Sequence, residues 1–230
     1  VRRPRRNRKS NAIREMVSET TLRPSQLIHP IFIQEGKNIK TEINSMPNFF
    51  RFSPDLAMKD VEEALKLNIK NFILFPQIEE KFKDKNASLS YKKNNLYLKM
   101  IQSLKKEFPE ITIITDVAMD PYNIDGHDGL VKDGKILNDE TLPILGKMAL
   151  AQAEAGADIL GPSDMMDGRV GYLREILDKN GFIDVGIMSY TAKYASCFYG
   201  PFRDALSSAP KSGDKKTYQM DIRNAKEALL

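Results

Sequence analysis

The chain has 230 residues, of which 41% are hydrophobic, and this is enough for one sizeable buried core. No stretch approaches the roughly 18 to 20 uninterrupted apolar residues that a membrane-spanning helix needs, so no membrane partner is expected. The single cysteine, Cys197, excludes an internal disulfide framework and a cysteine-rich metal cluster, and it favours a reducing compartment.

The formal net charge of +4 is unevenly distributed along the chain. Seven of the first fourteen residues are basic and none is acidic: Arg2, Arg3, Arg5, Arg6, Arg8, Lys9 and Arg14. Removing these seven from the 35 basic residues leaves 28 against 31 acidic residues, so the remainder is mildly acidic. Such an arm could bind nucleic acid or an anionic membrane, but no aromatic residues are interleaved and no nucleic-acid motif is recognisable. We expect a basic N-terminal arm at 1–24, a separate domain at 25–230, and no nucleic-acid partner.

Apolar runs alternate with segments of helical spacing along that domain. Buried strands are predicted at 27–33, 71–76, 111–116, 157–160 and 184–189. Helices are predicted at 55–67, 96–107, 139–155 and 168–179. Gly156 is a good residue to end the third helix, and Asn48 is suited to the positive φ angle of a turn at 45–48. The lysine- and asparagine-rich segment 79–95 is predicted to be a solvated loop, and 222–230 the start of a further helix.

Strands that alternate with helices predict a parallel sheet covered by helices, which is an α/β fold. Polar side chains follow the carboxyl ends of the strands, at Asp116, Ser163, Asp164 and Lys193. An open doubly wound sheet is the weaker alternative, because it requires a glycine-rich phosphate loop after the first strand and the sequence has none.

Lys193 is an unusual residue in its local context, because it stands among small and aromatic neighbours just after an apolar strand. An amine that is buried and close to a cation such as Arg203 is more easily held neutral, and a neutral amine can attack a carbonyl carbon. The alternative is a surface lysine whose aliphatic stem covers apolar neighbours.

The segment around Lys193 carries a long motif, Ser-Tyr-Thr-Ala-Lys-Tyr-Ala-Ser-Cys-Phe-Tyr-Gly-Pro-Phe-Arg-Asp-Ala, at 189–205. It closely resembles the Schiff-base lysine segment of the porphobilinogen synthase (delta-aminolevulinic acid dehydratase) family. The similarity continues through 213–220 and extends back through 161–170 to 2–7, so it covers nearly the whole chain.

The resemblance implies a TIM (β/α)8 barrel with an N-terminal arm, and about five of its eight strands are recognisable here. A complete barrel needs about 250 residues, so the sequence looks like an incomplete barrel. Members of this family continue beyond the matched region and carry a second Schiff-base lysine there. This chain alone is therefore not expected to complete the family's reaction.

The resemblance also implies the chemistry. The family condenses two 5-aminolevulinate molecules to porphobilinogen, with loss of two waters, in haem and tetrapyrrole biosynthesis. Lys193 matches the lysine that forms an imine with one substrate ketone. Arg203 and Lys215 match residues that hold its carboxylate, and Gln219 matches a hydrogen-bonding residue of the same half-site. Asp116 and Ser163 are expected to line the pocket.

The resemblance bears on the metal as well. The zinc-dependent branch has three cysteines where this sequence has Ala118, Asp120 and Asp128. Carboxylate oxygens suit Mg²⁺ better than Zn²⁺, so magnesium is the predicted cofactor and zinc is not expected. Asp120 and Asp128 are the candidate metal ligands. They are alternatively an acid and a base, or hydrogen-bonding partners of the substrate amine.

Other polar residues receive structural interpretations. His127 is predicted to order its loop rather than to transfer protons, His29 to be structural, Cys197 to pack, and Asp164 to line the pocket beside Ser163. By resemblance, the arm wraps a neighbouring subunit of a homo-oligomer, an octamer in the complete protein, in a plastid-type organelle or a bacterial cytoplasm. Two alternatives remain: another Schiff-base aldolase or lyase, and a truncated chain that binds ligand or joins full-length subunits without turnover.

Overall fold

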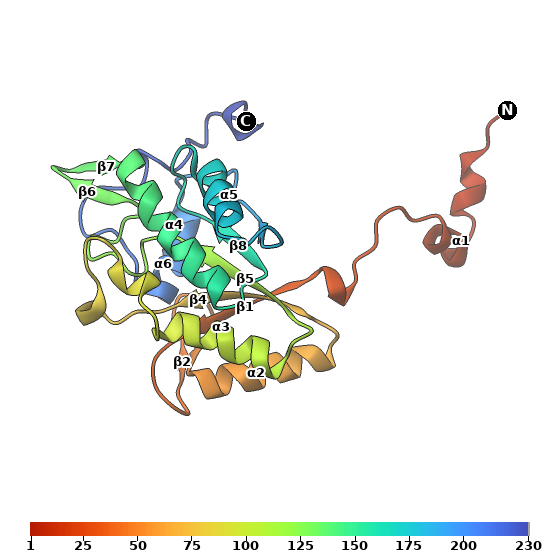
Figure 1. Ribbon diagram of the computed structural model, residues 1–230. Helices are drawn as coiled ribbons and strands as arrows, with labels where there is room; N and C mark the ends of the chain where they lie inside the picture. The colour runs from red at the N-terminus through yellow and green to blue at the C-terminus, as the bar shows by residue number, and fades with distance from the viewer. Residues whose placement is uncertain (230) are drawn as a thin grey trace.

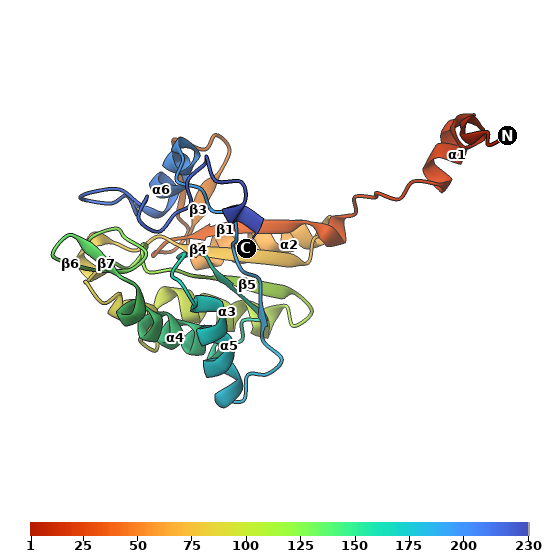
Figure 2. The ribbon, with the colours of Figure 1, turned by 90° about the horizontal axis from the view of Figure 1, so that it is seen from above.

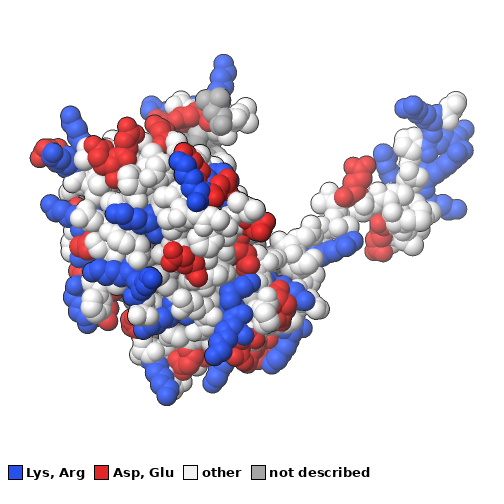
Figure 3. All heavy atoms as spheres, viewed as in Figure 1, with Lys and Arg blue, Asp and Glu red and all other residues white. Residues whose placement is uncertain are grey.

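The computed structural model describes residues 1–229 and shows a layered α/β body with a projecting N-terminal arm (Figure 1). The arm contains a 3-10 helix, Pro4–Arg8, and the short helix α1, Asn11–Met16. Nearly all side chains of residues 1–24 are exposed, and the basic ones crowd around the end of the arm (Figure 3). Within this chain, the arm therefore has almost no contact with the body.

A seven-stranded sheet forms the centre of the body, in the order β2-β3-β1-β4-β5-β8-β9. Five of its parallel strands lie side by side in chain order: β1 (Ile28–Ile33), β4 (Asn71–Pro76), β5 (Thr112–Val117), β8 (Ile159–Pro162) and β9 (Gly186–Ile187). A helix follows each of the first four: α2 (Pro54–Lys66), α3 (Leu96–Glu107), α4 (Asn138–Glu154) and α5 (Arg169–Lys179). This is the repeat of a (β/α)8 barrel with five barrel strands in the described residues, which confirms the predicted fold class.

The sheet has two faces, and alternate strand residues pack on each of them. The outer face is the one that α2, α3, α4 and α5 cover, and its buried strand residues include Ile31, Ile33, Phe72, Leu74, Ile113, Val117 and Leu160. The inner face carries Phe32, Ile73, Phe75 and Ile114. A short helix, α6 (Gly200–Leu206), lies on this opposite side of the sheet (Figure 2) and buries Ala205 and Leu206 there. The inner face is thus closed by α6 rather than by a long helix.

The predicted helices form where their ends and apolar faces indicate. The Asn95 side chain accepts a hydrogen bond from the Leu98 amide at 2.8 Å and caps α3. Gly156 has a φ of 104° just beyond α4, and Asn48 has a φ of 68°, as predicted. Among the residues described, no helix has both the length and the apolar character needed to cross a membrane.

Several short elements were not predicted. The strands β2 (Lys40–Glu42) and β3 (Phe50–Phe52) pair antiparallel and extend the sheet beyond β1, and β6 (Leu130–Lys132) and β7 (Lys135–Leu137) form a separate hairpin. Each of these strands has three residues, and α6 has seven. Segments this short do not show a clear period of two or 3.6 residues in the sequence.

Three sequence predictions are wrong in part. The segment 79–95 is not a fully solvated loop, because Lys83 is only 8% exposed and Ala87 and Ser90 are completely buried. The last strand is two residues long and half-buried, since β9 is the outermost strand of the sheet. The described part of 222–230 contains a 3-10 turn at Glu227–Leu229 instead of the start of an α-helix; residue 230 lies outside the described residues.

Candidate functional site

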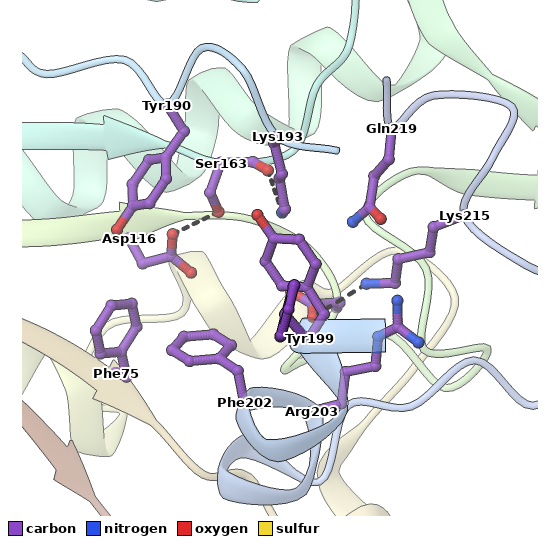
Figure 4. Close-up of a pocket in the computed structure, with 12 residues that line it drawn as sticks. Phe75, Asp116, Ser163, Tyr190, Lys193, Tyr199, Phe202, Arg203, Lys215 and Gln219 are labelled. Atoms are coloured by element: carbon purple, nitrogen blue, oxygen red, sulfur yellow. Dashed lines mark hydrogen bonds and ion pairs between the residues drawn. The ribbon is translucent and has the colours of Figure 1, made fainter. Parts of the chain in front are cut away.

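A cavity of about 230 Å³ lies at the carboxyl ends of the barrel strands, between the inner face and α6 (Figure 4). Its walls combine aromatic rings with charged groups, an arrangement that suits a small polar ligand. The lining residues are Phe75, Asp116, Asp120, Ser163, Tyr190, Lys193, Phe198, Tyr199, Phe202, Arg203, Lys215 and Gln219. Seven of the eight predicted site residues are therefore brought together, and the eighth, Asp128, lies directly behind them.

Lys193 reaches the cavity from the segment that follows β9. Its ammonium donates a hydrogen bond to the main-chain oxygen of Ser163, and it lies 5.7 Å from the centre of the Tyr199 ring. The Lys193 carbonyl accepts a hydrogen bond from the Met220 amide at 3.0 Å. This main-chain pairing joins the Lys193 segment to the segment that carries Gln219.

Asp116 and Ser163 form a second element of the site, at the ends of neighbouring strands β5 and β8. The Ser163 hydroxyl donates to Asp116 Oδ1 at 2.6 Å. Burial raises the pKa of Asp116 to about 7, although the Ser163 hydrogen bond opposes this rise. Near neutral pH this carboxyl can therefore either hold or release a proton inside the cavity.

The main chain of Asp116 is held from the outer face by two buried side chains. The Tyr97 hydroxyl, from α3, accepts from the Asp116 amide at 2.9 Å and donates to the Leu74 carbonyl at 2.8 Å. Gln152, from α4, donates to the Asp116 carbonyl at 3.0 Å and accepts from Thr115 at 2.7 Å. The helices on one face thus fix a carboxylate that points to the other.

Lys215 forms a buried ion cluster with Asp120 and Asp128. Its ammonium lies 2.8 Å from Asp128 Oδ2 and 3.3 Å from Asp120 Oδ2, and its side chain is 3% exposed. Burial alone would lower the pKa of Lys215, but the two carboxylates outweigh it and raise that pKa. Burial and the neighbouring Asp128 raise the pKa of Asp120; for Asp128, Lys193 and Lys215 overcome the effect of burial and lower the pKa to about 2.

The remaining polar groups come from the chain beyond β9. Arg203, on α6, points its guanidinium toward the Lys215 side of the cavity (Figure 4). Gln219 is 4% exposed, and within residues 1–229 its side-chain oxygen has no hydrogen-bond partner although it is buried. A ligand with a donor group would satisfy that oxygen.

In this arrangement the carboxylates of Asp120 and Asp128, the candidate metal ligands, are paired with Lys215. Both carboxylates bind the Lys215 ammonium, and in the part of the chain that the structure describes no group of three or more metal-ligating side chains gathers. Mg²⁺ requires near-octahedral oxygen coordination, which two carboxylates already paired with a lysine do not offer. The residues therefore fit a lysine-centred ion cluster better than a metal ion.

The predictions for Asp164 and Cys197 require correction. Asp164 does not line the cavity; it is completely buried, accepts from the Met166 amide at 2.7 Å and lies 3.7 Å from Arg169. Cys197 does not pack, because it is exposed in a 3-10 turn.

Both histidines lie in positions that favour structural roles. His127 contacts the Tyr218 hydroxyl and the Ser212 carbonyl at 3.0 Å each, and so ties two loops together. His29 contacts Asp60 at 2.7 Å, on the outer side of the body.

The aromatic residues of the cavity wall were not predicted. Phe75 is the residue before the end of β4, and Tyr190 follows β9, so an aromatic residue at a strand's carboxyl end was the available signal. Phe202 stacks edge-on against Phe75 with ring centres 5.0 Å apart, a contact between residues far apart in the sequence.

Comparison with known proteins identifies one family. A sequence model of the family described as delta-aminolevulinic acid dehydratase matches residues 1–230. The chain is 51% identical over 229 residues to the protein of that name from Chlamydia pneumoniae, covering 100% of this chain and 69% of the relative. It is 53% identical over 228 residues to that of Bradyrhizobium diazoefficiens, covering 99% and 65%, and 51% identical over 232 residues to the chloroplastic protein of Oryza sativa, covering 100% and 54%.

A solved structure matches the fold as well. The delta-aminolevulinic acid dehydratase (porphobilinogen synthase) of Toxoplasma gondii ME49, in complex with the reaction product porphobilinogen, superimposes with a TM-score of 0.94 at 48% sequence identity. The match covers 100% of this chain and 66% of that one. This chain thus spans between about half and two thirds of the length of most of these relatives.

Proposed function

The chain belongs to the delta-aminolevulinic acid dehydratase family, and from this premise we propose that its cavity binds one molecule of 5-aminolevulinate and forms an imine with it through Lys193. In the whole protein this step belongs to the condensation of two 5-aminolevulinate molecules to porphobilinogen and two waters, in tetrapyrrole and haem biosynthesis. The observation that carries the proposal is a primary amine and a guanidinium in one small cavity. These two groups match the ketone and the carboxylate of the substrate.

The imine step uses groups that are already in place. The uncharged Lys193 amine attacks the ketone carbon, a C–N bond forms, and the ketone oxygen leaves as water after it receives protons. Asp116, whose pKa is raised to about 7 by burial, can supply one of these protons near neutral pH. The hydrogen bond from Ser163 keeps the Asp116 carboxyl oriented at the end of β5.

We assign carboxylate recognition to Arg203 in the first place. In the described residues its guanidinium is in no ion pair, whereas Lys215 is already bonded to Asp120 and Asp128. A free guanidinium can bind a carboxylate through two parallel hydrogen bonds. Lys215 adds positive charge to the same wall, and Gln219 offers hydrogen-bonding groups to the ligand.

The predicted magnesium dependence stays a prediction, and we place no step of the reaction on a metal. Two carboxylates that share the Lys215 ammonium are better suited to hold the substrate amine as hydrogen-bond acceptors, and this role replaces metal ligation in our proposal. Zinc remains unexpected, because the matched positions carry no thiolate. Measuring imine formation with and without Mg²⁺ and a chelator tests this assignment.

Assembly and location are likewise proposed. The exposed arm at 1–24 is free to contact a neighbouring subunit, and we propose a homo-oligomer, an octamer in the complete protein. The named relatives include bacterial and chloroplastic proteins, which supports a bacterial cytoplasm or a plastid-type organelle.

A second candidate function is ligand binding without turnover. The described residues contain five barrel strands and one imine-forming lysine in the cavity, and the family's reaction joins two substrate molecules. A chain with this half-site alone would trap one 5-aminolevulinate and release no pyrrole.

Borohydride trapping tests the proposal. The chain is incubated with 5-aminolevulinate, reduced, and read by intact mass and peptide mapping, beside a colorimetric assay for pyrrole. We expect one adduct at Lys193, none in Lys193→Ala, and an unchanged yield in Lys216→Ala, whose side chain is 76% exposed. An adduct with pyrrole supports the complete reaction, an adduct without pyrrole supports the half-site, and no adduct on a folded chain overturns the role of Lys193. Cleavage of a sugar phosphate would instead identify an aldolase.

A further inference from the structure

Helix α6 places Arg203 and Phe202 in the cavity wall, yet it has only seven residues. A helix this short is not stable in water, so its position must come from its contacts with the rest of the protein. Ala205 and Leu206 supply an apolar anchor on the inner face, where both are completely buried. They leave the carbonyl groups at the end of the helix to be satisfied by other parts of the chain.

Two cations from separate parts of the chain, one on a strand and one in a loop, donate to these carbonyls. Lys83, from the connection between β4 and α3, donates to the Ser207 carbonyl at 2.6 Å. Arg51, on β3, donates to the carbonyls of Asp204 and Ala205 at 3.3 and 3.2 Å. Positive charge at the carboxyl end of a helix is also favoured by the helix dipole.

The position of Lys83 is unusual for a lysine. Its side chain is only 3% exposed, and burial lowers its pKa. Besides its hydrogen bond to the Ser207 carbonyl, the Lys83 ammonium has one ion pair among the described residues, with Glu80 at 3.7 Å. An ammonium is costly to bury, so a site that keeps one against a helix end indicates a specific positioning role.

We propose that Lys83 and Arg51 clamp the carboxyl end of α6 and thereby position Arg203 for ligands that carry a carboxylate. The link to Arg203 is short, because the Ser208 amide, one residue beyond the Ser207 carbonyl that Lys83 holds, donates to the Arg203 carbonyl at 3.0 Å. Lys83 and Arg51 are positioning residues, since neither lines the cavity. The inference rests on the proposed role of Arg203 in carboxylate recognition, and it adds the two residues that hold the Arg203 side chain in position.

The selectivity of Lys193 for a carboxylate-bearing ketone tests the proposal. The probes are 4-oxopentanoic acid, which is the substrate without its amine, and its uncharged amide, 4-oxopentanamide. Each is trapped on Lys193 with borohydride over a range of concentrations. In the wild type we expect half-maximal trapping at a concentration at least about tenfold lower for the acid, because a guanidinium binds only the acid through charge-assisted hydrogen bonds. Arg203→Gln should abolish this difference.

The clamp variants separate positioning from general stability. Lys83→Met should reduce the acid-to-amide preference to about threefold or less, while trapping of the amide changes less than about twofold. Lys83→Arg retains a cation that can donate to the Ser207 carbonyl and should keep the acid-to-amide preference of the wild type. Lys81→Met is the matched control two residues away, with a side chain 65% exposed, and should leave the preference unchanged. A folded Lys83→Met chain with wild-type preference overturns the proposal, as does loss of the preference in Lys83→Arg.

Hydrogen exchange of the peptide 200–208 measures the clamp independently of the chemistry. We expect exchange there to be about tenfold faster in Lys83→Met and unchanged in Lys81→Met, because fraying of α6 exposes its amides. Unchanged exchange in Lys83→Met overturns the clamp itself. If the wild type traps neither ketone, the proposed imine chemistry fails, and the exchange result still decides whether Lys83 holds α6.

Discussion

The two faces of the sheet are built from alternate residues of the same strands, but they are completed in different ways. The outer face is covered by long amphipathic helices and is almost entirely apolar. The inner face is apolar in the middle of the strands and carries charged groups at their carboxyl ends, where α6 and the loops beyond β9 close it. The outer face thus supplies stability through packing, and the inner face holds costly buried charges beside a cavity.

Removing the cation of the buried ion cluster should cause the largest loss of stability, and it would destabilise the inner face. Lys215→Met leaves the carboxylates of Asp120 and Asp128 buried without their counter-ion, which should cost roughly 3–5 kcal/mol of unfolding free energy. Urea unfolding followed by circular dichroism measures this. Lys216→Met, at an exposed neighbour, should change stability by less than about 0.5 kcal/mol. A loss below about 1 kcal/mol in Lys215→Met would mean that the cluster is solvated.

A cavity in the outer face should cost somewhat less. Leu104, on α3, is completely buried in the apolar cluster beneath the helices, and Leu104→Ala should lower the unfolding free energy by about 3 kcal/mol. Leu67→Ala, at a side chain that is 66% exposed, is the control and should have little effect. Comparable losses in the two variants would contradict the packed outer face. Urea unfolding followed by circular dichroism measures both losses.

The pH dependence of stability sharpens the comparison. Burial raises the pKa of Asp164 to about 7, so between about pH 4 and pH 7 the folded chain keeps a proton that the unfolded chain has released. Stability therefore falls as the pH rises through this window, by about 2 kcal/mol from this group between pH 5 and pH 7. Asp164→Asn should remove that part of the decline. Asp167→Asn, at an exposed position nearby, should leave the slope as it is.

The smallest loss of stability is expected from Tyr97, whose hydroxyl connects helix α3 on the outer face to the main chain of Asp116. Tyr97→Phe removes the hydroxyl that bridges the Leu74 carbonyl and the Asp116 amide, and should cost about 1–2 kcal/mol. Because Asp116 is then held less firmly, the pH profile of trapping on Lys193 should also change. Tyr91→Phe, which loses only a 3.4 Å contact to Ser88, is the control for both measurements. An unaltered pH profile in Tyr97→Phe would mean that the outer-face contact of Tyr97 does not influence Asp116 in the cavity.

The outer face could be predicted from the sequence because its information is local. The runs at 71–76 and 111–116 are mostly apolar, and the helix between them, α3, has a clear apolar side, so these strands and this helix follow from the pattern of the sequence. The same reasoning failed for 79–95, where Lys83 is buried by a contact with Ser207, 124 residues away. Nothing in the neighbouring residues indicates such a partner.

The residues of the inner-face site were predicted from the resemblance of a sequence motif and not from periodicity or charge. Lys193, Arg203 and Gln219 were placed in one site because of the resemblance, and the structure brings them to one cavity. The ion cluster of Lys215 was not predicted. Its two carboxylates were candidates for metal ligands, for an acid and a base, or for partners of the substrate amine, because the sequence shows the charge of a side chain but not which group lies beside it in the fold. Cys197 was predicted to be packed on the basis of its neighbours, and it is exposed because its turn lies outside the apolar clusters.

The chain order of the sheet has a consequence for how the protein is made on the ribosome. The barrel strands β1, β4, β5, β8 and β9 are each added beside the barrel strand that precedes them, so this part of the sheet can grow as the chain emerges from its N-terminus. Lys215 is synthesised 95 residues after Asp120 and 87 after Asp128. During this interval the two aspartates lack their counter-ion, so the cavity that Lys215 and Gln219 line can close only after the segment that carries them has been synthesised.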